Sequence, residues 1–349
     1  MRYFAGKALL ALGAAIFLAL PLRAGAQGPC GADDPGKTVR VTSLEALRAA
    51  LHTACPGTRV LIRPGHYAGR IIVGPLTAGT AERPIVVTAE QGLGSVTIDG
   101  AGATITWKFS GASFVHLKGL QITGGGYHGI FLDQGANNIL VENNRVFDNH
   151  RTRPLNSHAE IKGSRGGRAP WNVVLRGNEI FHATHPPGSN FQGIDCNFCR
   201  GFQVLGNHIH DIKQPTAFEH SYYDRGSCIQ FKSASEDILI AGNRIERCNI
   251  GVVLGGEGLA SPENISGVVR DNTIDQSAEI GLAVINARGF RIEGNRVTGP
   301  GISILLAKDR NYPEVRSSGW IEDNLLSSPV QGAETHDAHL RGNRVLPAR

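Results

Sequence analysis

The sequence has 349 residues, of which 45 are glycine and only 6% are aromatic. Its formal net charge is +5, but it contains no block of lysine and arginine and no alternation of basic with aromatic residues, which excludes nucleic acid as an expected partner. After the N-terminus, no apolar stretch approaches the roughly 20 residues that a membrane-spanning helix needs.

Residues 1–26 are typical of a bacterial export signal. Two basic residues accompany an apolar run over 8–22, and Ala24-Gly25-Ala26 is a small-x-small cleavage site, which disfavours a retained N-terminal anchor. Cleavage would remove three basic residues and no acid, which lowers the net charge from +5 to +2. We therefore expect a secreted or periplasmic protein with one domain over 27–349.

All six cysteines lie beyond this segment, and an even number in an exported protein favours disulfides. Cys30 and Cys55 flank the first amphipathic segment and are the pair we expect. A Cys-x-x-Cys motif over 196–199 has the spacing of a redox motif or half a zinc site, but no second half-site accompanies it. Structural cysteines are therefore favoured, with the pairing left open among Cys196, Cys199, Cys228 and Cys248.

The first regular element that the sequence predicts is a short helix over 43–54. Thr42-x-x-Glu45 is a capping box, and apolar residues follow at helical spacing at positions 44, 47, 51 and 54. An open stack of strands exposes unpaired backbone groups at its ends. We expect this helix to cover the N-terminal end of such a stack.

A seven-residue phrase then recurs, in which a short strand ends in a turn residue and asparagine and a second strand begins with an aliphatic residue. The turn pair tolerates a left-handed backbone, so each phrase makes a tight corner between two strands. Stacked corners would align the asparagines into a hydrogen-bonded ladder. Leu120 occupies the asparagine position of the first phrase, and the others carry Asn144, Asn178, Asn207, Asn243, Asn272, Asn295, Asn324 and Asn343.

These repeats predict an all-β fold, a right-handed parallel β-helix (solenoid) with one coil for each phrase. A leucine-rich-repeat horseshoe is disfavoured because the segments lack helical periodicity. The asparagines are 19 to 36 residues apart, so the longer intervals must contain loops that leave the coils.

Each coil also contains a further strand of alternating inward and outward residues. Alignment of these strands predicts that neighbouring coils, about 4.8 Å apart, bring polar side chains into one outward patch. The expected outward pairs include Phe131/Asp133 and Val253/Gly255 at the two ends. The polar patch is formed by the pairs between them, Glu160/Lys162, Asp195/Asn197 and Gln230/Lys232, with Glu160 level with Asp195.

The longest insertions, over 150–157, 182–190 and 211–226, lie beside the same coils. Charged residues on a sheet face are often simply solvated, but the coincidence of patch and insertions favours a site for an anionic polysaccharide. The insertions would wall a groove with His182, His185, His210, His220, Tyr222, Tyr223, Asp224 and Arg225.

This combination favours β-elimination of a uronate polymer or the related C5 epimerisation, which both need a base and a stabilised enolate. Lys232 or Lys162 would be the base, although Lys232 could equally pair with Asp195. Tyr222, Tyr223 or a loop histidine such as His220 would protonate the leaving oxygen. Hydrolysis ranks lower, because Glu160 and Asp195 project from one sheet.

The remaining candidates bind substrate or metal. Asp195, Asn197, Gln230, Glu160, His182 and Tyr223 are the expected substrate-binding residues. Ca²⁺ would take hard oxygen ligands from Glu160, Asp195 and Asp133.

Three motifs carry a resemblance to the pectate-lyase-like superfamily, and within it to the chondroitinase B and alginate lyase group, polysaccharide lyase family 6. They are Pro56-Gly57-Thr58-Arg59-Val60, Pro64-Gly65-His66-Tyr67 and the segment 79–89. The stretches 228–233 and 251–256 resemble the catalytic part of that family.

The resemblance implies that Lys232 occupies the position of the family's lysine base. The family's catalytic arginine falls on Gly255, and its calcium-binding carboxylates fall near Arg225 and Ser227. Arg225 or Lys162 would then supply the missing charges. The sequence thus predicts a monomeric polysaccharide lyase or epimerase, and the alternative is a non-catalytic glycan-binding or surface β-helix protein.

Overall fold

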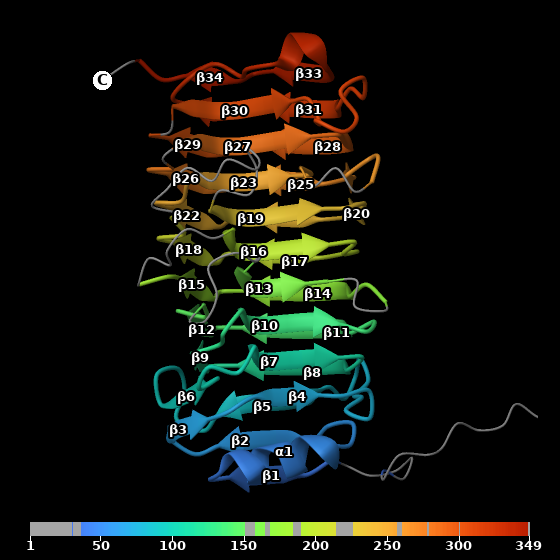
Figure 1. Ribbon diagram of the computed structural model, residues 1–349, viewed down its shortest axis with the longest axis vertical. Helices are drawn as coiled ribbons and strands as arrows, with labels where there is room; N and C mark the ends of the chain where they lie inside the picture. The colour runs from blue at the N-terminus through green and yellow to red at the C-terminus, as the bar shows by residue number, and fades with distance from the viewer. Residues whose placement is uncertain are drawn as a thin grey trace, which may run out of the picture.

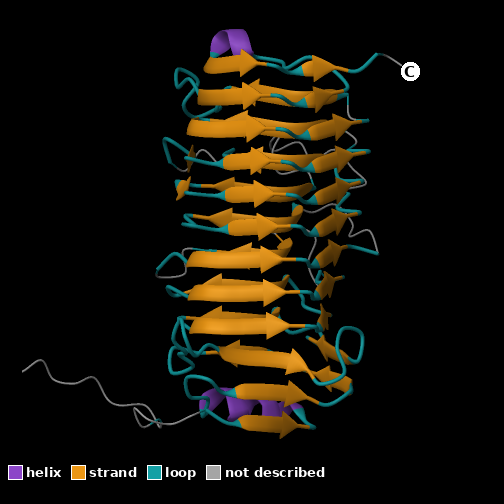
Figure 2. Ribbon diagram, turned by 180° about the vertical axis from the view of Figure 1, so that it is seen from behind, coloured by secondary structure: helices purple, strands orange, loops and turns teal. Residues whose placement is uncertain are grey.

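The computed structural model describes residues 30, 36–150, 158–164, 168–183, 190–213, 226–256, 260–277, 279–299 and 301–347. Over these residues the chain winds into coils that stack along one long axis, from the N-terminal coil at one end to the C-terminal coil at the other (Figures 1 and 2). The strands pair in parallel within three sheets. The expected signal segment, 1–26, lies outside the described residues.

Sheet A contains the strands that lead into the asparagine corners. Its members are β1 (Thr38–Val41), β2 (Arg59–Ile62), β5 (Ile85–Ala89), β8 (Ser113–Lys118), β11 (Asn137–Glu142), β14 (Trp171–Arg176), β17 (Gln203–Leu205), β20 (Ser235–Glu236), β21 (Leu239–Ala241), β24 (Asn264–Ile265), β25 (Val268–Arg270), β28 (Ala287–Glu293), β31 (Ser318–Glu322) and β33 (Asp337–Arg341).

Sheet B contains the short strands that follow the corners. Its members are β3 (Gly65–Ala68), β6 (Val96–Asp99), β9 (Gln121–Thr123), β12 (Arg145–Phe147), β15 (Glu179–Phe181), β18 (His208–His210), β22 (Arg244–Glu246), β26 (Thr273–Asp275), β29 (Arg296–Thr298), β32 (Leu325–Leu326) and β34 (Arg344–Val345).

Sheet C completes each coil with a longer strand. Its members are β4 (Ile71–Val73), β7 (Ile105–Ser110), β10 (His128–Asp133), β13 (His158–Gly163), β16 (Phe191–Asn197), β19 (Ser227–Lys232), β23 (Ile250–Leu254), β27 (Ile280–Ile285) and β30 (Ile302–Ala307).

Two short helices lie at the ends of the stack (Figure 2). Helix α1 (Leu44–His52) covers the first coil and buries Leu47 and Leu51, as the sequence predicts, whereas η1 (Ala333–Thr335) lies near the C-terminus. Ser43 is the N-cap rather than Thr42, because the Ser43 hydroxyl accepts a hydrogen bond from the Ala46 amide at 3.1 Å. Among the described residues, no helix is long and apolar enough to cross a membrane.

The predicted asparagine ladder joins sheet A to sheet B. At each corner the residue before the asparagine adopts a left-handed backbone, as at Gly206 (φ 58°) and Asp271 (φ 56°). The side-chain oxygen of each asparagine then accepts hydrogen bonds from the preceding coil's asparagine, as Asn272 does from the backbone and side-chain amides of Asn243, both at 2.9 Å. Even Leu120 donates its backbone amide to Asn144 at 2.9 Å, so the ladder continues to the first phrase.

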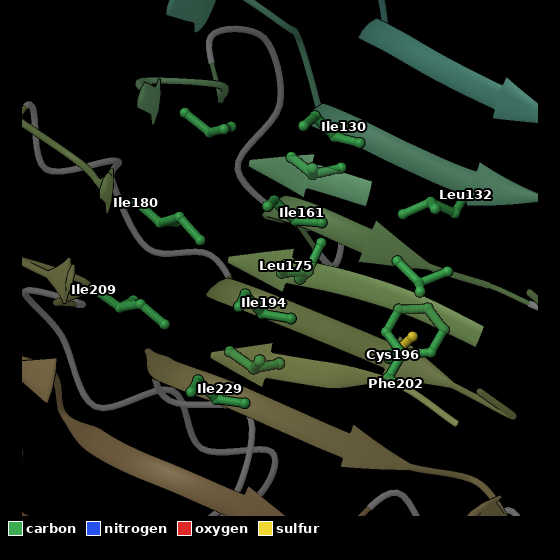
Figure 3. Close-up of a cluster of buried hydrophobic side chains, with 14 of the residues drawn as sticks. Ile130, Leu132, Ile161, Leu175, Ile180, Ile194, Cys196, Phe202, Ile209 and Ile229 are labelled. Carbon is green, nitrogen blue, oxygen red and sulfur yellow. The ribbon is translucent and has the colours of Figure 1, made fainter. Parts of the chain in front are cut away.

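The core is a continuous column of aliphatic side chains between the three sheets. Figure 3 shows Ile130, Ile161, Ile194 and Ile229, which occupy equivalent positions in successive strands of sheet C and are all buried. Because successive strand residues point to opposite faces, the neighbours of these isoleucines must point away from the core.

The six cysteines form three disulfides. Cys30 pairs with Cys55, as expected, and ties the described N-terminal residue to the end of α1. The four cysteines left open pair as Cys196–Cys199 and Cys228–Cys248. The Cys-x-x-Cys segment is therefore a disulfide here and offers no zinc half-site.

We predict that Asn272→Ala lowers the free energy of unfolding by about 2–6 kcal/mol, because it leaves the backbone amide of Asn243 and the carbonyl of Ile240 without these partners, at about 1–3 kcal/mol each. Chemical denaturation followed by circular dichroism measures this. Arg270→Ala in the same corner is the control, since Arg270 is exposed. A loss no larger than that of the control would contradict a stabilising ladder.

Candidate functional site

The predicted polar patch lies on β13, β16 and β19, which are adjacent in sheet C. Strands of sheet A alternate between buried and partly exposed residues, but β13 and β19 are buried at every position. The outward face of sheet C is thus shielded from solvent at these coils. If the charged side chains of this face were simply solvated, they would be exposed and not buried.

Three charged side chains form the centre of the patch, and we call them the lysine–aspartate triad: Lys162, Asp195 and Lys232. The register places Lys162 level with Asp195 on the next coil. The Lys162 ammonium donates a hydrogen bond to Oδ2 of Asp195, and the Lys232 ammonium lies 3.6 Å from Oδ1 of the same carboxylate. The exposed fractions of the three residues are 7%, 0% and 2% in that order, so the triad is a buried ion cluster.

This register corrects the predicted alignment of β13. We expected Glu160 to be level with Asp195, but Ala159 pairs with Gln192 and Ile161 with Ile194, which places Glu160 two residues away from that level. The alternation of inward and outward residues has a period of two, so a shift by two residues leaves the pattern unchanged.

Glu160 instead anchors a corner of the coil. Its carboxylate accepts hydrogen bonds from the Asn149 side chain at 2.6 Å and the Asn149 backbone at 3.2 Å. Nδ1 of His182 lies 3.1 Å from the same carboxylate. Glu160 and His182 therefore belong to one network, which is separate from the ion pairs of Asp195.

Asn197 and Gln230 are the other predicted patch residues, whereas Asp133 was predicted only as a Ca²⁺ ligand. Asn197 is level with Lys232, and Gln230 is level with Asp195, so both lie within the patch. Asp133 lies outside it, because its carboxylate forms an ion pair with Lys108 at 2.7 Å.

Several buried oxygen atoms of the patch accept no hydrogen bond from the part of the chain that the structure describes. They belong to Asp195, Asn197, Gln230 and Gln192. The Gln230 side-chain amide donates to the carbonyl of Gly255 at 3.3 Å, which leaves its oxygen as the atom without a partner. Buried acceptors are normally satisfied, so these oxygens would suit a ligand that carries hydroxyl donors.

Three imidazole rings gather around His150, and a fourth, that of His128, interacts with Lys162; sequence reasoning missed three of the four. His150 stands at 3.9 Å from His158 and 6.4 Å from His182, measured between ring centroids. His128 stacks on Phe131 at 5.3 Å. The signal was present in the sequence, because His128 and His158 both begin a strand of sheet C, but only later strand positions were compared.

Burial and charge determine the protonation of this region. Burial, together with the ammonium of Lys162, lowers the pKa of His128 to about 3. Nδ1 of His128 lies 3.2 Å from both the amide nitrogen and the carbonyl oxygen of Ala159, so this backbone fixes the orientation of the ring. Although burial opposes it, the ammonium groups of Lys162 and Lys232 hold the pKa of Asp195 below its ordinary value.

Most of the predicted loop residues lie outside the described part of the chain. They are His185, His220, Tyr222, Tyr223, Asp224 and Arg225. His210 is described, and its placement corrects the prediction. It belongs to β18 of sheet B, where its ring stacks on Phe181 at 5.0 Å.

The three carboxylates expected to bind Ca²⁺ do not come together among the described residues. Asp133 pairs with Lys108, Glu160 with His182, and Asp195 with two ammonium groups. A divalent cation beside Asp195 would be repelled by both lysines, so this donor set does not fit calcium.

The polysaccharide lyase family that the sequence resembles has its catalytic arginine at the position of Gly255, but the backbone here cannot accept that arginine. Gly255 has φ 97°, and a Cβ atom at this position would lie 1.9 Å from the carbonyl oxygen of Ile285. The missing guanidinium is thus excluded by the backbone of the coil itself.

The pKa of His128 predicts acid sensitivity. The folded-state pKa of about 3 lies below the ordinary 6.5, so the stability from the neutral ring is full above pH 6.5 and is lost as the pH falls towards 3. At pH 5 the loss is about 2 kcal/mol.

Urea unfolding at pH 7 and pH 5 tests this. We expect His128→Asn to remove about 2 kcal/mol of the pH-dependent difference, whereas His339→Asn, at an exposed position, leaves it unchanged. An unchanged difference in His128→Asn would mean that another group causes the acid sensitivity.

Solved structures share this fold at low sequence identity. Pectate lyase Pel9A is 14% identical with a TM-score of 0.59, and the match covers 88% of this chain and 79% of that one. Polygalacturonase from Erwinia carotovora ssp. carotovora is 10% identical with a TM-score of 0.57, covering 89% and 93%. PfbA, a surface adhesin of Streptococcus pneumoniae, is 14% identical with a TM-score of 0.53, covering 86% of each chain.

These proteins have different activities, so their likeness to this chain concerns the fold alone. No curated protein matches the sequence. The family model for the right handed beta helix region matches residues 109–318, which is more than half of the chain. The predicted right-handed parallel β-helix is therefore confirmed, and the chain belongs to the right-handed β-helix family.

Proposed function

We propose that this protein is an exported polysaccharide lyase that cleaves a uronate-containing, anionic glycan at the lysine–aspartate triad. The observation that carries the proposal is the burial of two lysines around one aspartate on the outward face of sheet C. Its three disulfides support an oxidising compartment outside the cytoplasm.

Because these charges are buried, a catalytic role of the triad is favoured over the role of an ordinary surface ion pair. Electrostatic interactions are stronger where water is excluded, and a site that holds an enolate needs fixed positive charge there. Lys162 is the triad residue with the greater exposure, at 7%, so we place the substrate carboxylate next to its ammonium.

The reaction assigns one role to each residue of the triad. Lys232 first gives its ammonium proton to solvent and then, as the neutral amine, removes the proton from the carbon beside the uronate carboxylate. The electron pair forms a carbon–carbon double bond as the neighbouring glycosidic C–O bond breaks, and the departing oxygen takes up a proton from water. Asp195 positions both lysines, and Lys162 stabilises the negative charge of the enolate.

The oxygen atoms without partners support a sugar as the ligand. Hydroxyl groups of a glycan would donate to the buried side-chain oxygens of Asn197 and Gln230. The neutral ring of His128, whose pKa is lowered by burial and by Lys162, adds a further polar group for the sugar. No step of this mechanism involves Ca²⁺.

A C5 epimerase would begin with the same proton removal and return the proton to the opposite face of the sugar. A non-catalytic glycan-binding protein is the main alternative, and the exclusion of an arginine at Gly255 favours it. The experiment below separates these outcomes.

We predict that the protein releases unsaturated uronates from at least one of alginate, chondroitin, heparin-type glycans and pectate, measured by the absorbance of the new double bond. Lys232→Ala should lower the rate by about 10²–10⁴-fold, as expected for the loss of a general base. Lys118→Ala is the matched control, because Lys118 also pairs with a carboxylate but lies in sheet A.

If Lys232→Ala still binds glycan and the unmodified protein forms no product at any pH, the protein is a glycan-binding protein and not a lyase. Exchange of solvent deuterium into the polymer without absorbance would identify an epimerase instead.

A further inference from the structure

A second cluster of ionisable side chains lies on sheet B, away from the triad. Glu179 of β15 is level with His208 of β18 on the next coil, and His210 follows two residues later on the same face of the strand. The ligand atoms of these three residues all lie within 4.8 Å of one another. Within the described ranges, no other group of three histidine, cysteine, aspartate or glutamate residues meets this distance.

The ring of His210 is held in one orientation. It stacks on Phe181 with an angle of 4° between the planes, and its Nδ1 lies 2.6 Å from Oδ2 of Asp211. Arg247 holds this carboxylate through two nitrogens, at 2.7 and 2.8 Å. Metal-binding histidines are commonly oriented in this way, with one ring nitrogen against a carboxylate and the other directed at the metal.

The other two residues are positioned by their own neighbours. Arg145 binds Oε2 of Glu179 at 2.6 Å, which leaves Oε1 directed towards His210. Oε2 of Glu246 lies 3.1 Å from Nε2 of His208, whose ring centroid lies 4.2 Å from that of His210.

The spacing between Glu179 and His210 suits a shared metal better than a direct hydrogen bond. Nε2 of His210 and Oε1 of Glu179 are 3.4 Å apart, which is long for a hydrogen bond between charged groups. Two ligand atoms that each lie about 2.1 Å from one tetrahedral zinc ion are about 3.4 Å apart.

We propose that Glu179, His208 and His210 form a binding site for a first-row transition metal of the zinc class. Two imidazoles and one carboxylate are a common zinc ligand set and leave at least one coordination position for water or an anionic ligand. Ca²⁺ and Mg²⁺ prefer oxygen ligands and would not select this site. The proposal is independent of the lyase reaction, because the triad lies in sheet C.

The half-exposed position makes the site accessible from solvent. The side chain of His208 is 36% exposed, that of Glu179 33% and that of His210 11%. The alternative is a network of ion pairs, in which a protonated His210 bridges Glu179 and Asp211 without a metal. The two models differ in what added zinc does.

Titration calorimetry of the untagged, full-length protein with Zn²⁺ tests the site. We expect one ion per chain, and at least a 100-fold loss of affinity in His210→Ala and Glu179→Gln. His66→Ala is the matched control, because His66 also faces a carboxylate across one coil of sheet B, at 3.3 Å from Asp99, but has no second imidazole beside it.

Visible absorption of the Co²⁺-loaded protein gives a second measurement that does not depend on activity. Asp211→Asn should weaken metal binding about 10- to 100-fold while His210 stays in place, as expected for a positioning residue. Thermal unfolding of each metal-free variant shows whether it is folded. If folded His210→Ala and Glu179→Gln bind Zn²⁺ as tightly as the unmodified protein, or if that protein binds no Zn²⁺, the proposal is wrong.

Discussion

The hydrogen bonds between successive asparagine corners are the constraint on which the rest of the fold depends. Each side-chain oxygen, as in Asn207 or Asn243, accepts both the backbone and the side-chain amide of the asparagine one coil earlier. These bonds form only if neighbouring coils are in register at that corner. The ladder therefore sets the level of every strand that follows the corner, and long insertions can leave the coil only elsewhere.

A fixed register also determines how charges are arranged along the stack. Side chains at equivalent positions of neighbouring coils lie about 4.8 Å apart, so like charges would repel and opposite charges pair. In sheet A, Glu142 is level with both Lys118 and Arg176. In sheet C, Asp195 is level with Lys162 and also pairs with Lys232, which lies two residues further along the next strand. The same pattern has different consequences, because the groups of sheet A are partly exposed, whereas those of sheet C are buried and interact at a lower effective dielectric constant.

The sequence predicted the parts of this structure that local chemistry determines. The corners, the helix at Leu44–His52 and the Cys30–Cys55 pair follow from turn residues, helical spacing and position along the chain. The level of Glu160 was wrong, because a two-residue shift preserves the alternation of buried and outward residues. The imidazole cluster around His150 was missed because its rings come from the starts of strands and from a corner, which only the folded coil brings together.

The backbone at Gly255 explains why the cationic groups of the candidate site are arranged as they are. A residue with φ 97° and a carbonyl oxygen 1.9 Å from its would-be Cβ must be glycine, so the coil that carries β23 cannot place a cation at this level. The positive charge beside Asp195 comes instead from β13 and β19, on either side of β16. Asp195 lies on the strand between them, so its two carboxylate oxygens reach a lysine on either side.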